Sequence, residues 1–107
     1  MFNVVFLVKR HPGMSQEAFA RYWIEDHTPL TARVPGVRSY RCYPAAGSQD
    51  GEAPFDGVAI LTFDDEAAYR TALTGAEFTA ALEDAPAFQD TGQTTSFFAA
   101  EHVIVGP

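Results

Sequence analysis

A histidine interrupts an apolar stripe in the first third of the chain. Positions spaced by four, four, three and four residues share one side of an α-helix. Here those positions hold Phe19, Trp23, His27, Leu30 and Val34. Imidazole titrates near neutral pH and can both take up and release a proton, so a histidine at an apolar cavity could act as a general acid or base. The alternative is a structural histidine, partly buried and with its hydrogen bonds satisfied.

Metal and nucleotide chemistry find no support in the sequence. The three histidines show no metal-binding spacing, and neither a Cys/His cluster nor a His-Glu-x-x-His helix occurs. The glycines at positions 13, 36 and 75 fit turns or helix caps rather than a phosphate loop. Cys42 has no partner base nearby in the sequence, which is typical of a small buried side chain rather than a nucleophile. We therefore expect neither a metal nor an organic cofactor.

Length, composition and charge narrow the class of protein. The 107 residues are 47% hydrophobic and 20% charged, and they include nine Phe, four Tyr and one Trp. This composition predicts one globular domain over residues 1–107. The formal net charge of -7 repels phosphate backbones and anionic membranes, so we expect no nucleic-acid or membrane partner. Cys42 is the single cysteine and cannot form an internal disulfide, which fits a cytoplasmic location.

The first half of the chain predicts two strands around a helix. The apolar run Phe2–Lys9 predicts a buried strand, and it is too short for a bilayer span and lacks the features of a signal peptide. Ser15 is expected to cap the helix that carries the histidine. Pro29 should break this helix, and a short second turn should then reach Val34. The alternation over residues 37–43 predicts the second strand.

The second half repeats the pattern after a polar loop. Gly57–Phe63 predicts a third strand, and the aspartates that follow it can cap a helix. Thr74–Glu77 matches a capping box, so another helical segment should start there and run to about Asp84. The residues it is expected to bury are Phe78, Ala81 and Leu82. The aromatic and β-branched run Phe97–Val105 predicts the last strand.

The resulting order is β-α-β-β-α-β. This split βαβ arrangement places two helices on one face of a four-stranded antiparallel sheet, giving a ferredoxin-like α+β fold. The second and third strands along the chain carry bulky apolar residues on both faces, and an apolar sheet face is rarely left in water. We expect a second copy to cover it in a symmetric homodimer. The alternative is a monomer whose second face is less apolar.

The segment Phe19-Ala-Arg-Tyr-Trp-Ile-Glu-Asp-His-Thr-Pro-Leu30, followed by Val34-Pro-Gly-Val37, resembles the signature of the EthD family, named for ethyl tert-butyl ether degradation. The Phe-x3-Trp-x3-His helix followed by Pro-Gly is the specific part. The resemblance implies the dimeric α+β barrel fold. Similar proteins include muconolactone-type isomerases, small polyketide cyclases, dehydratases, decarboxylases and members with no assigned activity. Fold alone therefore does not fix the function.

The resemblance also implies site residues. In active relatives the residue that matches His27 points into a pocket and moves protons, commonly without a metal or organic cofactor, and Trp23 is expected to line the same pocket. Tyr40 and Arg38 share one face of the second strand, where either could donate a hydrogen bond to an enolate or phenolate oxygen. The alternative places Tyr40 in the core and Arg38 at the rim. Asp26 projects about 100° away from His27 around the helix, which argues against a direct relay between these neighbours.

We therefore predict a cofactor-independent lyase, cyclase or isomerase that acts on a small, apolar, cyclic or polyketide-like carbonyl compound. His27 would be the general acid or base, with Trp23, Tyr40 and Arg38 as substrate-binding candidates. The rival hypothesis is a non-catalytic or stress-related dimer that binds a small molecule, for which haem with His27 as axial ligand is one candidate.

Overall fold

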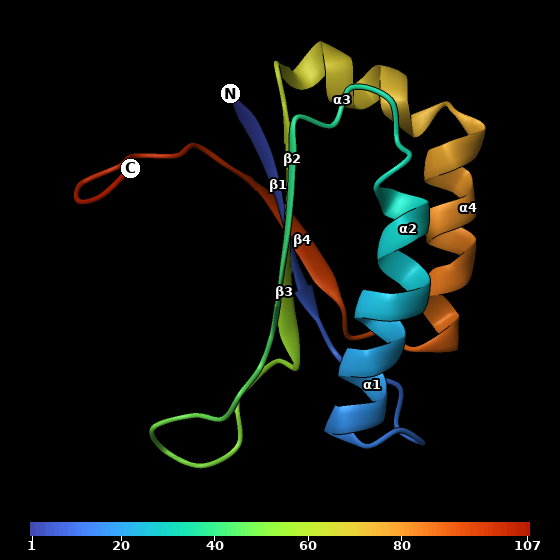
Figure 1. The fold of residues 1–107 in the computed structure, drawn as a ribbon, viewed down its shortest axis with the longest axis vertical. Coiled ribbons are helices and arrows are strands. Elements are labelled where there is room, and N and C mark those ends of the chain that lie inside the picture. The colour runs from blue at the N-terminus through green and yellow to red at the C-terminus, as the bar shows by residue number, and fades with distance from the viewer.

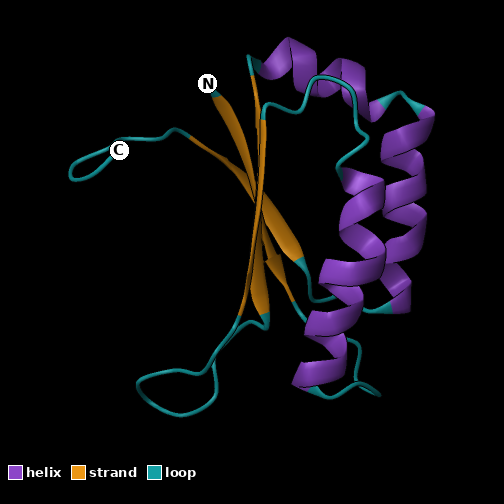
Figure 2. Ribbon diagram, in the orientation of Figure 1, coloured by secondary structure: helices purple, strands orange, loops and turns teal.

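The computed structural model describes residues 1–107 as a four-stranded antiparallel sheet with helices on one face (Figures 1 and 2). The elements are β1 (Phe2–Val8), α1 (Gln16–Tyr22), the π-helical turn η1 (Trp23–His27), α2 (Thr28–Thr31), β2 (Ser39–Pro44), β3 (Gly57–Phe63), α3 (Glu66–Leu73), α4 (Ala76–Asp84), the 3-10 turn η2 (Ala85–Ala87) and β4 (Thr95–Ala99). This order confirms the β-α-β-β-α-β prediction and the ferredoxin-like α+β fold.

The sheet order is β2-β3-β1-β4, and every neighbouring pair is antiparallel. Paired residues share a face, and successive residues along a strand alternate between faces. Val4 of β1 lies opposite Leu61 of β3, which in turn lies opposite Tyr40 of β2. These three residues face the helices, because Val4 and Leu61 belong to the buried core against which Tyr40 packs.

The core beneath the helices is dense in aromatic rings. Phe19, Trp23, Phe63 and Phe88 are fully buried, and burial of such a side chain contributes about 1.5–3 kcal/mol. Trp23 packs so closely on β3 that a Cβ added at Gly57 would lie 2.2 Å from its Cζ3 atom. Gly57 is therefore required for space rather than for backbone conformation.

The helix that carries His27 begins as predicted but does not break at Pro29. The Ser15 hydroxyl accepts a hydrogen bond from the Ala18 amide at 3.1 Å. In η1 the helix widens, and the Thr28 amide donates to the Trp23 carbonyl five residues back. The Thr28 hydroxyl donates to the Ile24 carbonyl at 2.6 Å. Pro29 has no backbone N–H to donate within the helix. The wider turn leaves room for its ring, and the Thr28 hydroxyl provides a donor for the Ile24 carbonyl, so the helix continues into α2.

The π-helical turn also changes which residues face the core. A π turn takes more residues than an α turn, so positions four apart stay aligned through it. The buried stripe therefore continues from His27 to Thr31, which is 6% exposed. Leu30, expected on this stripe, is only partly buried. The buried stripe therefore carries the Thr31 hydroxyl, where the sequence pattern predicted Leu30.

The capping box predicted at Thr74–Glu77 is not formed. Thr74 instead ends α3, and its hydroxyl donates to the Thr71 carbonyl at 2.7 Å. Gly75 is the N-cap residue of α4, and no side chain accepts a hydrogen bond from the first turn of this helix. Phe78 and Ala81 are buried on α4 as predicted, but Leu82 is 54% exposed.

The last strand ends at Ala99 rather than at Val105. Ala99 lies opposite Asn3, so the register of β4 reaches the beginning of β1 at this point. Because β1 begins at Phe2, it can offer a partner to at most one further residue, Ala100. The segment after β4 and the loop between β2 and β3 both project from the side of the sheet away from the helices (Figure 1).

The second face of the sheet carries no helix. Its apolar side chains, assigned from the strand register, are Val5, Leu7, Tyr43, Val58, Ile60 and Phe97. Tyr43 and Phe97 are 51% and 50% exposed. Both faces of the sheet are therefore apolar, as the sequence predicted. None of the helices has the length and apolar character that a membrane crossing requires.

Candidate functional site

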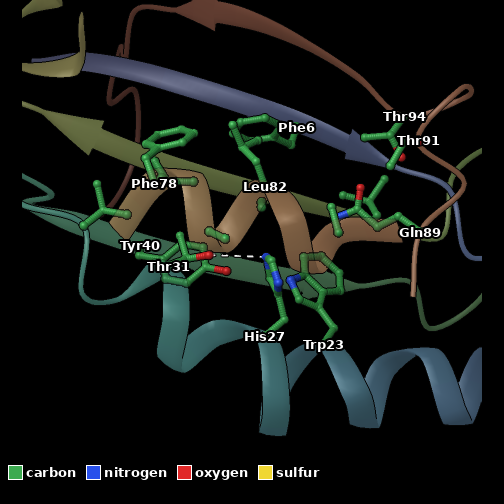
Figure 3. A pocket seen from close by; sticks show the side chains of 16 residues that line it. Phe6, Trp23, His27, Thr31, Tyr40, Phe78, Leu82, Gln89, Thr91 and Thr94 are labelled. Carbon is green, nitrogen blue, oxygen red and sulfur yellow. Dashed lines mark hydrogen bonds between the residues drawn. The ribbon is translucent and has the colours of Figure 1, made fainter. Parts of the chain in front are cut away.

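A cavity of about 230 Å3 lies between the helices and the sheet (Figure 3). Eleven of its 16 lining residues are hydrophobic, and Lys, Arg, Asp and Glu are absent from the lining. The other five are His27, Thr31, Gln89, Thr91 and Thr94, and Tyr40, counted among the hydrophobic residues, adds a hydroxyl. An apolar cavity with a few polar groups is typical of a small-molecule site.

His27 reaches this cavity from the last position of η1. Its side chain is 9% exposed, and its ring packs on Phe88 with 4.6 Å between centroids. Nδ1 lies 2.9 Å from Oδ2 of Asp84, and Nε2 lies 3.3 Å from the Thr31 hydroxyl. Both ring nitrogens therefore have partners, on opposite sides of the ring.

The Asp84 carboxylate determines which nitrogen of His27 carries the proton. A carboxylate can only accept, so in the neutral ring Nδ1–H donates to Asp84 and Nε2 is the acceptor for the Thr31 hydroxyl. The Tyr22 hydroxyl donates to the other carboxylate oxygen at 2.7 Å. This hydrogen bond to Asp84 raises the pKa of Tyr22. Asp84 is thus held by two donors, and the Nε2 lone pair of the neutral His27 ring meets the Thr31 hydroxyl at the cavity wall.

Sequence reasoning did not find Asp84, which it used only to mark the end of a helix. Asp26, the neighbour considered and set aside, is exposed. One signal was available: α4 ends in Glu83-Asp84 with no basic residue in its last turn. Carboxylates at a helix C-terminus are disfavoured by the helix dipole, so an aspartate there indicates a partner elsewhere.

Trp23 and Tyr40 both line the cavity. Trp23 is 1% exposed and fixed between Phe19 and Gly57. Burial raises the pKa of Tyr40, so its hydroxyl stays protonated and able to donate. Figure 3 shows the Tyr40 side chain beside Thr31. The structure therefore brings His27, Trp23 and Tyr40 to one cavity.

Arg38 is not among the residues that line this cavity. It precedes β2 and is exposed, where Nε and an Nη atom donate to the two oxygens of Asp64 at 3.0 and 2.9 Å. This bidentate pair lowers the pKa of Asp64. Arg38 is thus engaged at the surface, which matches the rim position that the sequence left open as the alternative.

The structure contains no group of three or more His, Cys, Asp or Glu side chains that could hold a metal ion. Cys42 is partly buried, and burial raises the pKa of its thiol. A thiol held in its protonated form is a weak nucleophile.

The fold and the cavity define a ferredoxin-like α+β protein with a histidine–aspartate pair at an apolar pocket. The EthD domain model matches residues 11–92, so the chain belongs to the EthD family. The match confirms the resemblance carried by the Trp23 and His27 helix.

Solved structures share the fold. An EthD family protein from Bacillus halodurans superposes with a TM-score of 0.80 at 25% identity, covering 95% of this chain and all of that one. A dimeric ferredoxin-like protein of unknown function from Thermobifida fusca gives 0.73 at 16% identity, covering 94% and 90%. SnoaB from Streptomyces nogalater, described as a cofactor-independent oxygenase, gives 0.67 at 18% identity, covering 96% and 95%. Among curated proteins, none matches this chain.

Proposed function

We propose that this protein is a cofactor-independent enzyme that moves a proton next to a carbonyl group, in a lyase, cyclase or isomerase reaction on a small apolar substrate. The observation that carries the proposal is the pairing of His27 with Asp84, which leaves an unprotonated Nε2 at an apolar cavity. A base of this kind needs no metal to act, because neutral imidazole accepts a proton near neutral pH.

The reaction starts with the substrate carbonyl near the Thr31 and Tyr40 hydroxyls. As the Thr31 hydroxyl turns from Nε2 toward the substrate oxygen, Nε2 of His27 takes a proton from the carbon next to the carbonyl, and the electron pair of that C–H bond forms the enolate. The enolate oxygen accepts hydrogen bonds from the protonated Tyr40 or Thr31 hydroxyl, which stabilises its charge. Asp84 stabilises the imidazolium, and Nε2–H then returns the proton to another atom of the substrate or to a leaving group.

The haem alternative from the sequence fits the cavity poorly. Haem carries two propionates, and the lining offers no Lys or Arg to pair with them. The volume of about 230 Å3 also lies below the roughly 300–1,000 Å3 of pockets for drug-sized ligands. These features support an uncharged ligand smaller than haem. That SnoaB is described as cofactor-independent is in keeping with such chemistry on this fold.

The proposed assembly is a homodimer formed by the open face of the sheet. Its apolar side chains would leave water if a second copy packed on the same face about a two-fold axis. The cavity lies on the helix side, so each copy keeps its own site. The single free cysteine remains in keeping with action in the cytoplasm.

Hydrogen–deuterium exchange of α-tetralone in D2O tests the proton-transfer step directly. The ketone has an exchangeable C–H next to its carbonyl, and mass spectrometry counts the deuterium it gains. The enzyme should accelerate this exchange, and His27→Ala should lower the rate about 10²–10⁴-fold. His27→Asn is the matched control for structure, because its amide can still donate to Asp84 but cannot act as the base.

Two outcomes separate the rival hypotheses. Loss of exchange in both variants, with melting temperatures close to that of the parent, supports His27 as the base. Exchange that persists in His27→Asn, or a parent protein that binds the ketone without exchanging it, would leave a binding protein as the better description.

A further inference from the structure

The cavity has a second polar end that the proposed reaction does not use. Gln89, Thr91 and Thr94 lie together at one end of the pocket, away from Tyr40 and Thr31 at the other (Figure 3). The strand register agrees with this view. Tyr40 is level with Val4, near the start of β1, through the pairing of both with Leu61. Gln89 is bridged to Arg10, beyond the end of the same strand.

The groups at this second end are available to a ligand. The Gln89 amide takes part in none of the side-chain hydrogen bonds of the chain, whereas its backbone amide is fixed to the Ala85 carbonyl at 2.9 Å. The Thr94 hydroxyl accepts from the Lys9 amide at 3.1 Å, which leaves its own proton free to donate. This end of the cavity therefore offers donors from the Gln89 side-chain amide and the Thr94 hydroxyl, and an acceptor in the Gln89 side-chain carbonyl. The backbone of both residues is held by hydrogen bonds.

The charge of the lining selects against ions at this end. The lining contains no Lys or Arg, and the chain as a whole carries a formal charge of -7. A carboxylate placed here would find no cation in the lining to offset the part of its water shell that it loses on entering the cavity, which is costly. A neutral hydroxyl or carbonyl would instead find the Gln89 amide and the Thr94 hydroxyl.

We propose that the substrate is an uncharged, flat compound of about two fused rings with a second oxygen, a hydroxyl or carbonyl, at the end remote from the reacting carbonyl. Gln89 is the specificity-determining residue that recognises this oxygen. The ring size follows from the volume of about 230 Å3 and from the aromatic side chains of Phe6, Trp23 and Phe78 in the lining. The proposal rests on the proposed function only in assigning the reacting carbonyl to the end of the cavity near Tyr40 and Thr31. Recognition of the second oxygen does not require turnover.

Three matched probes test the proposal by binding alone. α-Tetralone carries only the carbonyl, 6-hydroxy-α-tetralone adds a hydroxyl on the far ring, and the 6-carboxy analogue puts a carboxylate there. Dissociation constants from equilibrium dialysis should rank the hydroxy compound tightest, about 3- to 10-fold tighter than α-tetralone, the range of one net hydrogen bond. The carboxylate should bind at least about 10-fold more weakly than the hydroxy compound.

Variants of Gln89 then assign the effect to this residue. Gln89→Leu should bring the hydroxy compound within about 2-fold of α-tetralone, while the affinity for α-tetralone itself stays within about 2-fold. Gln89→Lys should reverse the preference, so that the carboxylate binds more tightly than the hydroxy compound. Gln93→Leu is the matched control, because Gln93 lies in the same loop but is bonded to Asp90 and does not line the cavity. It should bind all three probes as the parent does.

The binding measurements test the subsite, and the exchange measurements test the proposed reaction, so each proposal can be contradicted without the other. Equal affinity of the parent for all three probes, or a hydroxy preference that survives in Gln89→Leu, would overturn the subsite whatever the exchange rates are. The expected ranking in His27→Asn, where exchange is absent, would support the subsite even if the proposed reaction proved wrong.

Discussion

Asp84 accepts a hydrogen bond from Nδ1 of His27 at 2.9 Å across 57 positions of sequence. The contact joins the end of α4 to the end of η1, so it forms only when the helices pack together. Asp84 does not line the cavity and cannot touch a substrate there. It is a positioning residue that fixes the tautomer and direction of the ring.

Asp84→Asn should therefore slow proton transfer without removing the base. An asparagine amide can donate to Nδ1, which would move the ring proton to Nε2 and take away the lone pair that faces the cavity. We expect the exchange rate of α-tetralone to fall about 10²-fold or more, as in catalytic triads whose histidine loses its orienting carboxylate. Nitrogen-15 NMR of His27 should show protonation moving from Nδ1 to Nε2.

The chain supplies an internal reference and a control for that experiment. His11 accepts from the Gly13 amide through Nδ1 at 3.1 Å, so its neutral ring should carry the proton on Nε2 in parent and variant alike. Tyr22→Phe removes the second donor to Asp84 but keeps the carboxylate, so His27 should keep its tautomer. An unchanged His27 spectrum in Asp84→Asn would rule out the positioning role.

Local signals predicted most of the fold, because they depend on neighbours in sequence. The limits of β3 are as predicted, the predicted Ser15 cap is present, and of the two aspartates that could cap the next helix, Asp64 and Asp65, it is Asp65 that does so. His27 was found because its aligned neighbours are apolar. Asp84 was missed because its partner lies on another helix, and helical periodicity says nothing about which helices meet.

Two further differences have physical causes that sequence pattern does not contain. The buried face of the helix includes Thr31 rather than Leu30, because the helix widens into a π turn before Pro29 and does not break there. Strand β4 ends at Ala99, opposite Asn3, and β1 itself begins at Phe2, so it has no partners for a strand that continues to Val105. Propensity alone favours a strand through Val105, but pairing requires a second strand.

Gly57→Ala should destabilise the protein and disturb the site. The added Cβ would lie 2.2 Å from Cζ3 and 2.7 Å from Cη2 of Trp23, so the indole must move. Overpacking of this kind costs about 1–3 kcal/mol of unfolding free energy. Urea unfolding measures the loss, and the emission of the single tryptophan reports its displacement directly.

Gly13→Ala is the control for that substitution. A Cβ at Gly13 would meet its nearest atom, in the His11 ring, at 3.4 Å, which is ordinary contact. This variant should change the unfolding free energy by less than about 0.5 kcal/mol. Parent-like stability and tryptophan emission in Gly57→Ala would show that the packing of Trp23 on β3 is looser than the structure indicates.

Stability should fall as the pH rises through the alkaline range. Burial raises the pKa of Tyr40 and of Cys42, whose ordinary values are 10.0 and 9.0. Above those values the unfolded chain releases protons that the folded protein still holds, so the free energy of unfolding decreases with pH. Tyr40→Phe should flatten the decline above pH 10 by up to about 1.4 kcal/mol per pH unit, the contribution of one proton. Urea unfolding from pH 8 to 11 tests this, and equal slopes in parent and variant would contradict it.

The dimer is testable through Ile60, which lies on the open face between Val5 and Arg41. The parent should sediment at twice the 11.7 kDa chain mass at micromolar concentration. Ile60→Asp places a charge in the proposed interface and should give the chain mass with an unchanged circular dichroism spectrum, because its side chain points away from the helix-covered core.

Ser96→Asp is the matched control for the dimer, since Ser96 lies opposite Phe6 and therefore on the helix side of the sheet. An aspartate there adds the same charge to an exposed strand position without touching the open face, so the dimer should persist. In the proposed dimer the cavity lies on the helix side of each copy, so monomeric Ile60→Asp should keep ketone exchange per chain within a few-fold of the parent. A parent protein that sediments at the chain mass would remove the second copy from the open face, and loss of exchange in a folded monomer would mean that the partner completes the site.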